Sequence, residues 1–119
     1  MKATELRIGN YIEFCDNESW SLHIVVPKDL HVMHMLDSDL SESYRPIPLT
    51  KQWLRKFGFD YEGKTFHWYT KGKVSISFTE GRMVLDIGVS YNQFKIPEYV
   101  HQLQNLYFAL TGEELTLSS

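Results

Sequence analysis

Cysteine is almost absent from the sequence: Cys15 is the only one among 119 residues. A lone thiol cannot close a disulfide within the chain, which excludes the disulfide-stapled folds of small secreted proteins. Cys15 has no activating neighbour in the sequence, and we interpret it as a small buried hydrophobic residue. We expect a reducing, cytoplasmic setting for the protein.

Long hydrophobic runs are also missing. The longest unbroken aliphatic stretch covers only residues 24–26, whereas a membrane-spanning helix needs about 20 apolar residues. The first ten residues, MKATELRIGN, contain no apolar run of signal-peptide length. We therefore expect no export signal, no transmembrane helix and no membrane partner.

Basic residues are fewer than acidic residues in the sequence. Lys and Arg number 12 against 15 Asp and Glu, and the formal net charge is -3. The chain as a whole therefore has no electrostatic attraction for phosphate groups or anionic lipids. Apolar and aromatic residues, by contrast, make up 43% and 14% of the sequence, which is enough for a core. We expect a single domain over residues 1–119.

The first third of the chain predicts N-terminal β-strands over residues 1–36. Residues 11–14 and 20–26 are rich in β-prone side chains, and Pro27 ends the second run because proline has no N–H to donate. The stretch from Leu30 to Leu36 fits both a strand and a helix. We interpret it as a strand and keep a helix as the alternative.

A loop and a short helix follow. Residues 37–48 are polar and contain two prolines, which is typical of a surface loop. Residues 49–58 predict a short helix, because Thr50 is a suitable N-cap and Gly58 suits a left-handed stop.

Three glycines then recur at intervals of nine residues, with β-branched and aromatic runs between them. This spacing predicts an antiparallel β-meander with tight turns over residues 63–96. Val74 and Ile76 alternate with Ser75 and Ser77, so we expect one face of the sheet to be core and the other polar.

A longer C-terminal helix is predicted over residues 97–112, with Pro97 in its first turn and Gly112 after its last. Residues 114–118 are then available as an edge strand. Together the elements predict an α+β domain, in which a short central helix and the C-terminal helix accompany the meander. The expected core consists of Trp53, Leu54, Val74, Ile76, Leu85, Ile87, Leu103, Leu106 and Leu110.

The C-terminal helix carries no charged residue over VHQLQNLYFALTG, residues 100–112. At 100° per residue its apolar arc faces the sheet, which leaves an uncharged second face. In one interpretation loops or the N-terminal strands cover that face, and its amides satisfy backbone groups nearby. In the other it contacts a second protein or a second copy of the chain. The candidate partner surface consists of His101, Gln104, Asn105 and Phe108.

Three blocks of the sequence, ELRIGNYI, PIPLTKQWLRKFGF and VHQLQNLYFALTGEEL, cover 38 of the 119 residues. Together they resemble a family of small proteins, without assigned activity, from Bacteroidetes genomes and their phages or prophages. The resemblance implies a cytoplasmic protein of cellular or mobile-element origin. It brings no catalytic residues with it.

Candidate metal ligands carry weak signals. His31 and His34 share a face only if their segment is helical, and no third histidine, CxxC or HExxH motif accompanies them. Residues 37–41 resemble the start of an EF-hand loop, but Glu42 replaces the glycine of the turn and Pro48 replaces the last ligand. We expect no metal ion and no cofactor.

Catalytic residues are not indicated either. Ser75, Ser77, His67 and Asp86 would have to meet from neighbouring strands, without the G-x-S-x-G turn of hydrolases. Side chains of these types are also what the solvated face of a sheet contains.

Basic and aromatic residues alternate in the middle of the chain, a pairing that single-stranded nucleic-acid binding uses. The residues are Arg45, Lys51, Arg55, Lys56, Lys71 and Lys73, with Trp53, Phe66, Trp68 and Tyr69. The acidic overall charge argues against this function. The sequence therefore favours a non-enzymatic protein-interaction or accessory protein. The alternatives are a small nucleic-acid-binding module and, third, an enzyme with a dispersed site.

Overall fold

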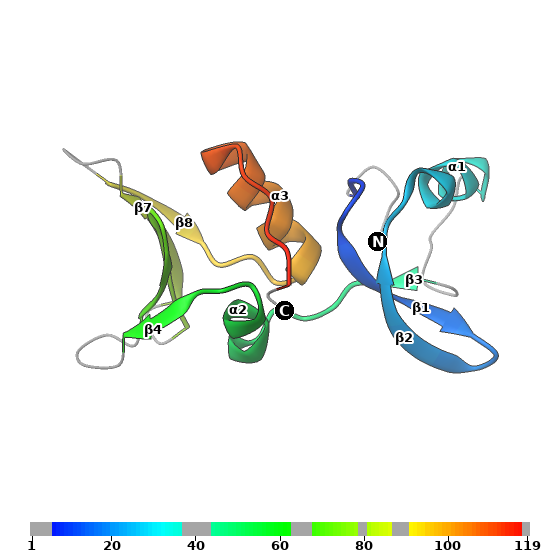
Figure 1. The fold of residues 1–119 in the computed structure, drawn as a ribbon, viewed down its shortest axis with the longest axis horizontal. Helices are drawn as coiled ribbons and strands as arrows, with labels where there is room; N and C mark the ends of the chain where they lie inside the picture. The colour runs from blue at the N-terminus through cyan, green and yellow to red at the C-terminus, as the bar shows by residue number, and fades with distance from the viewer. Residues whose placement is uncertain (1–5, 37–43, 63–67, 79–80, 87–90, 118–119) are drawn as a thin grey trace. The chain divides into compact units, whose positions relative to one another are not determined.

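Antiparallel sheets and short helices make up the fold (Figure 1). The computed structural model describes residues 6–36, 44–62, 68–78, 81–86 and 91–117. Within these ranges the elements are β1 (Tyr11–Asp16), β2 (Ser19–Ile24), α1 (Pro27–Leu36), β3 (Tyr44–Arg45), α2 (Lys51–Lys56), β4 (Asp60–Glu62), β5 (Trp68–Lys71), β6 (Val74–Ser77), β7 (Arg82–Asp86), β8 (Tyr91–Lys95) and α3 (Val100–Thr111).

The strands form two separate sheets. One has three strands in the order β2-β1-β3, and the other has five in the order β4-β5-β6-β7-β8. All the pairings are antiparallel. The five-stranded sheet is the predicted meander, and the α+β class is confirmed. The meander begins earlier than predicted, because β4 starts at Asp60.

The chain divides into two compact units. The N-terminal unit consists of Met1–Pro48 and Glu98–Leu106, and the meander unit of Leu49–Pro97 and Tyr107–Ser119. Helix α3 therefore contributes residues to both units. The expectation that residues 1–119 behave as one domain stays a prediction.

A tight hairpin joins the first two strands. Asp16 pairs with Ser19, and the two residues between them, Asn17 and Glu18, have φ angles of 50° and 66°. Positive φ at both central residues is the geometry of the two-residue turn whose twist matches that of the strands. The core of this unit, Leu6, Ile12, Val25 and Tyr44, packs with Phe14 of β1 and Leu30 of α1.

The prediction of a strand from Leu30 to Leu36 is wrong, because residues 27–36 form helix α1. Strand β2 ends at Ile24, before Pro27 is reached. Pro27 instead occupies the first helical position, where a missing N–H costs nothing. Asp29 reaches back and accepts a hydrogen bond from the N–H of Val26 at 2.8 Å. This is the carboxylate half of a capping box, which the sequence interpretation overlooked.

Helix α2 follows its prediction closely. The Thr50 hydroxyl accepts a hydrogen bond from the N–H of Trp53 at 3.4 Å, and Gly58 has a φ of 89°. In the predicted loop, residues 37–43 lie outside the described residues, while Tyr44–Arg45 is the short strand β3.

The alternation in the meander is confirmed for its apolar residues. Val74, Ile76 and Met83 are fully buried. The polar face differs from the prediction at Ser77, which is buried as well. Of the other expected core residues, Leu54 and Leu103 are fully buried, while Trp53, Leu106 and Leu110 are half-buried. Ile87 and the side chain of Leu85 lie outside the described set.

The C-terminal helix begins at Val100 and not at Pro97. Tyr99 forms a β-bridge with Pro48, and the N–H of Val100 donates to the carbonyl of Ile47 at 2.8 Å, so this stretch is extended before the helix begins. The helix ends as predicted at Gly112, whose φ is 76°. Residues 114–117, the described part of the segment that was available as an edge strand, form no strand.

Burial along α3 generates a stability prediction. Leu103→Ala should lower the free energy of unfolding by about 2 to 5 kcal/mol, because it removes a fully buried side chain and leaves a cavity. Leu110→Ala, a control on the same helix, should cost clearly less because Leu110 is half-buried. Urea titrations of both variants measure this difference. Equal losses would show that the helix is rotated about its axis relative to this structure.

Candidate interaction surface

The polar face of α3 is occupied by contacts within the N-terminal unit. Gln104 is fully buried, and its side-chain oxygen accepts a hydrogen bond from the N–H of Tyr11 at 2.8 Å. Its side-chain nitrogen donates to the carbonyl of Gly9 at 3.0 Å. One amide therefore satisfies a backbone donor and a backbone acceptor at the entrance to β1.

Asn105 contributes to the same contact. Its side-chain oxygen accepts a hydrogen bond from the amide of Asn10 at 2.9 Å and another from Nε of Arg7 at 2.9 Å. Asn10 is itself buried, and its side-chain oxygen accepts from the N–H of Arg7. Residues 7–11 and helix α3 are thus joined by side-chain amides, as the first of the two sequence interpretations expected.

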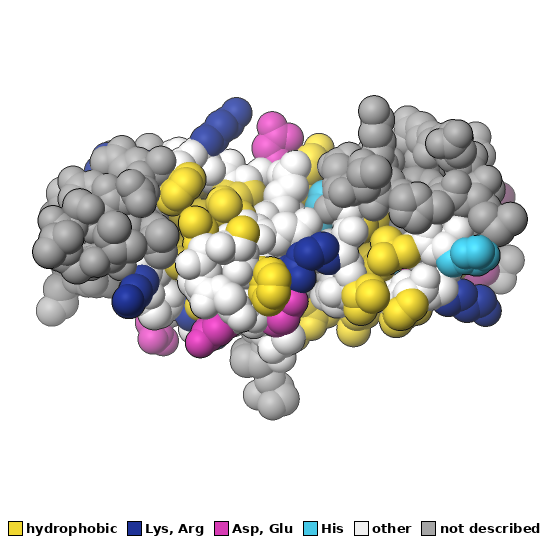
Figure 2. Space-filling model, turned by 90° about the horizontal axis from the view of Figure 1, so that it is seen from above, with side chains coloured by type: hydrophobic (Ala, Val, Ile, Leu, Met, Phe, Trp, Pro, Cys, Tyr) yellow, Lys and Arg dark blue, Asp and Glu magenta, His cyan; other side chains and the backbone are white. Residues whose placement is uncertain are grey.

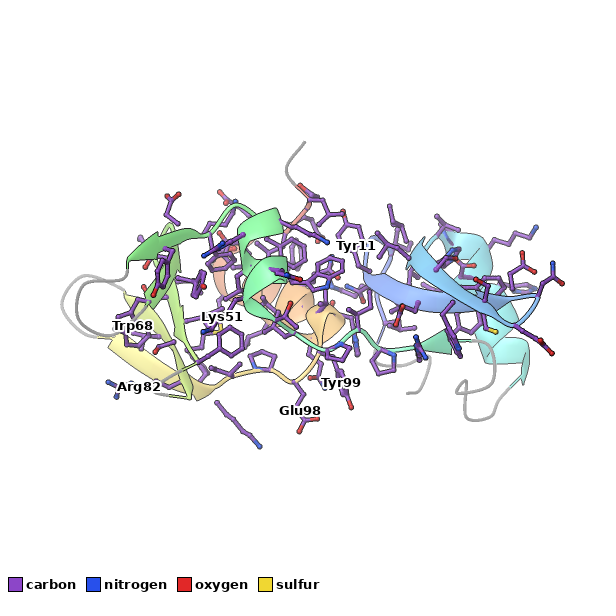
Figure 3. The ribbon with its side chains drawn as sticks, turned by 90° about the horizontal axis from the view of Figure 1, so that it is seen from below. Tyr11, Lys51, Trp68, Arg82, Glu98 and Tyr99 are labelled. Carbon is purple, nitrogen blue, oxygen red and sulfur yellow. The ribbon has the colours of Figure 1, made fainter. Side chains whose placement is uncertain are left out.

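The four residues of the candidate partner surface consequently do not form one exposed patch. His101 is buried and stacks on Tyr99 with ring centroids 6.0 Å apart, and Figure 3 labels Tyr99 just ahead of α3. Gln104 is buried, and Asn105 is half-buried in the contacts above. Only Phe108 is exposed, with 39% of its surface accessible.

A different surface of the N-terminal unit is apolar and exposed. Leu22 and Ile24 of β2 are each 49% exposed. Their side chains lie on the same face of the strand as Trp20, because side chains alternate along a strand. Ile8 and Val26 are also exposed in this unit. Figure 2 shows exposed hydrophobic side chains (yellow) on this unit, in the right half of the view. We call Trp20, Leu22 and Ile24 the β2 face.

Charged residues flank the β2 face without interrupting it. Glu13 pairs across the sheet with both Leu22 and Arg45. Nε of Arg45 donates to the Glu13 carboxylate at 2.9 Å, and its guanidinium lies 4.2 Å from the ring centre of Trp20. The two charges neutralise each other beside an aromatic ring. Cys15, predicted to be buried, is only half-buried.

The opposite face of the sheet is closed by α1. Asp29 accepts a hydrogen bond from Nε2 of His23 at 2.9 Å while it also caps the helix. Burial, and secondly the negative charge of Asp29, raise the pKa of Tyr44 above its usual value. His23 and Tyr44 both pack on the ring of Phe14. The hydrogen bond between His23 and Asp29 therefore links α1 to the sheet.

The four edges of the two sheets differ in how they are protected. Natural sheets guard edge strands with charge, proline or short length. The edges formed by β3, β4 and β8 have such guards: β3 has two residues and precedes Pro46, β4 carries Asp60, and β8 carries Lys95. Strand β2, SWSLHI, is six residues long and contains no Asp, Glu, Lys or Arg.

Some of the basic residues considered for nucleic-acid binding lie over aromatic rings of their own chain. Lys56 lies 5.0 Å from the ring centre of Trp53, and Arg55 lies 6.0 Å from that of Tyr61. Trp68, one of the aromatic residues considered, has the guanidinium of Arg82 at 5.7 Å from its ring centre; both residues are labelled in Figure 3. The ammonium of Lys71 donates to the carbonyl of Phe57. Phe66 lies outside the described residues.

The candidate catalytic residues lie only partly within the described ranges. Ser75 forms a hydrogen bond with Thr70, while His67 and the side chain of Asp86 lie outside the described set. In that set no three His, Cys, Asp or Glu residues are grouped as a metal ion requires. His31 is on helix α1, so its spacing to position 34 is helical after all. No helix of the described chain is long and apolar enough to cross a membrane.

Comparison with known proteins adds no relative: no family model, no curated protein and no solved structure matches the chain.

Two glutamines of α3 provide a matched test of the polar contact. Gln104→Leu should destabilise the protein by about 1 to 3 kcal/mol for each of the two buried backbone groups that it leaves unsatisfied. Gln102 also accepts backbone N–H bonds, from Glu98 and Tyr99, but nearer to solvent. Gln102→Leu should therefore cost no more than about 1 kcal/mol, because water can replace the amide. Thermal melts of both variants make the comparison, and a Gln104→Leu variant as stable as the wild type would contradict it.

Proposed function

We infer that the protein is a non-enzymatic, cytoplasmic interaction protein that binds another polypeptide through the β2 face. The observation that carries this proposal is the exposure of Leu22 and Ile24 on an edge strand without charged residues. Apolar side chains concentrated at one exposed site are typical of protein-binding surfaces, whereas scattered single ones are not. An edge strand adds backbone groups that a second chain can pair with.

The proposal moves the partner surface from α3 to β2. The uncharged helix face has its amides bound within the N-terminal unit and leaves Phe108 as its exposed apolar residue, whereas β2 presents Leu22 and Ile24 side by side on one face. An accessory role, including one linked to phage or prophage, is compatible with the Bacteroidetes family resemblance, which carries no catalytic residues. A nucleic-acid partner has less support, because the aromatic rings beside the basic residues already hold cations of the same chain.

A photo-crosslinker placed in β2 tests this function. Leu22→p-benzoylphenylalanine puts the probe on the exposed face, and irradiation of the producing cells should join the chain to another polypeptide. Lys51→p-benzoylphenylalanine is the control, since Lys51 is exposed on α2 in the other unit. Adduct masses on denaturing gels give the result. Absence of adducts at position 22, or equal adducts at both positions, would remove the β2 face as a binding surface.

A further inference from the structure

The backbone of β2 has hydrogen-bonding groups directed away from its own sheet. The N–H of Val25 donates to the carbonyl of Asn10 at 2.9 Å, which marks that pair as hydrogen-bonded. Such pairs alternate along an antiparallel ladder, so Ser21 and His23 direct their backbone groups towards β1. The N–H and C=O groups of Trp20, Leu22 and Ile24 therefore point outwards from the edge of the sheet.

Of the three residues whose backbone groups point outwards, Leu22 and Ile24 also have exposed side chains, and Trp20 is half-buried. We propose that β2 pairs antiparallel with β2 of a second copy of this chain, about a two-fold axis at Leu22. This proposal rests on the proposed function and names the partner. Trp20 then pairs with Ile24 of the other copy, Leu22 with its own equivalent, and Ile24 with Trp20. No other symmetric register pairs all three outward-facing residues of both copies.

Charge favours a second copy as the occupant of this edge. In a symmetric antiparallel pair every residue lies opposite a residue of the same strand, so any charged strand that pairs with itself risks like-charge contacts. The strand SWSLHI carries no Asp, Glu, Lys or Arg, so no such contact arises. Glu13, the nearest acidic residue on the same face, is neutralised by Arg45.

Side-chain chemistry agrees with this register on both faces of the joined sheet. On the β2 face, Trp20, Leu22 and Ile24 of the two copies form one apolar row, and burial of these residues removes their exposed area from water. On the other face Ser21 lies opposite His23 of the second copy, which pairs polar with polar. The contact involves one strand from each copy and is smaller than a standard stable interface, so we expect reversible, concentration-dependent dimers.

Sedimentation equilibrium with charge-swapped variants tests the pairing. Wild-type protein should rise from the mass of one chain, 14.0 kDa, towards twice that mass as its concentration increases. Leu22→Lys should remain at the mass of one chain, because two ammonium groups meet at the axis. Leu22→Glu should do the same, but an equimolar mixture of the two variants should associate again, since lysine then faces glutamate. Ile8→Lys, at an exposed apolar position outside β2, is the control and should associate like the wild type.

Amide hydrogen exchange of the wild type gives a second measurement that needs no variant. Protection at Trp20, Leu22 and Ile24 should increase with protein concentration, while Ser21 and His23 are protected at every concentration because they pair with β1. A wild type that stays monomeric at all concentrations, or a dimer without this alternating protection, overturns the pairing. In that case an adduct of position 22 with a different protein would still support the proposed function, and absence of any adduct would remove both.

Discussion

The N-terminal unit depends on satisfying two buried backbone groups at the entrance to β1. The carbonyl of Gly9 needs a donor and the N–H of Tyr11 needs an acceptor, and Gln104 supplies both from one side chain. A carboxylate at this position would lack the donor, and a lysine would lack the acceptor. The requirement explains why this face of α3 is polar yet uncharged: it is built for amide contacts within the chain.

Local signals were sufficient wherever an element is determined by residues close to one another. Thr50 and Gly58 bound α2 through contacts within a few positions, and both ends of that helix were predicted. The same reasoning failed at α1, because Pro27 was considered only as the end of a strand and it is the first residue of the helix. It failed again at the start of α3, because the bridge between Tyr99 and Pro48 links segments that are 51 residues apart.

The sequence predicted an uncharged interaction surface, but it did not predict which element carries that surface. Lack of charge marked an unusual segment in α3, and the helical wheel gave its two faces. Which face is covered depends on contacts between residues 93 to 98 positions apart in sequence, such as Gln104 and Tyr11, and periodicity contains no such information. Strand β2 also contains no Asp, Glu, Lys or Arg. In α3 the uncharged residues His101 and Gln104 are buried, whereas in β2 the uncharged residues Leu22 and Ile24 are exposed. The sequence does not distinguish these two cases.

The division of α3 between the two units has a consequence for how the protein is made. The N-terminal unit takes Glu98–Leu106 from near the other end of the sequence, and α3 is also needed by the meander unit. During translation the β1–β2 hairpin leaves the ribosome long before Gln104 has been added to the chain. Until then the backbone groups that Gln104 binds can only be satisfied by water or by a chaperone. Completion of this unit is therefore a late event, because contacts between distant segments have to wait for the last of them to be synthesised.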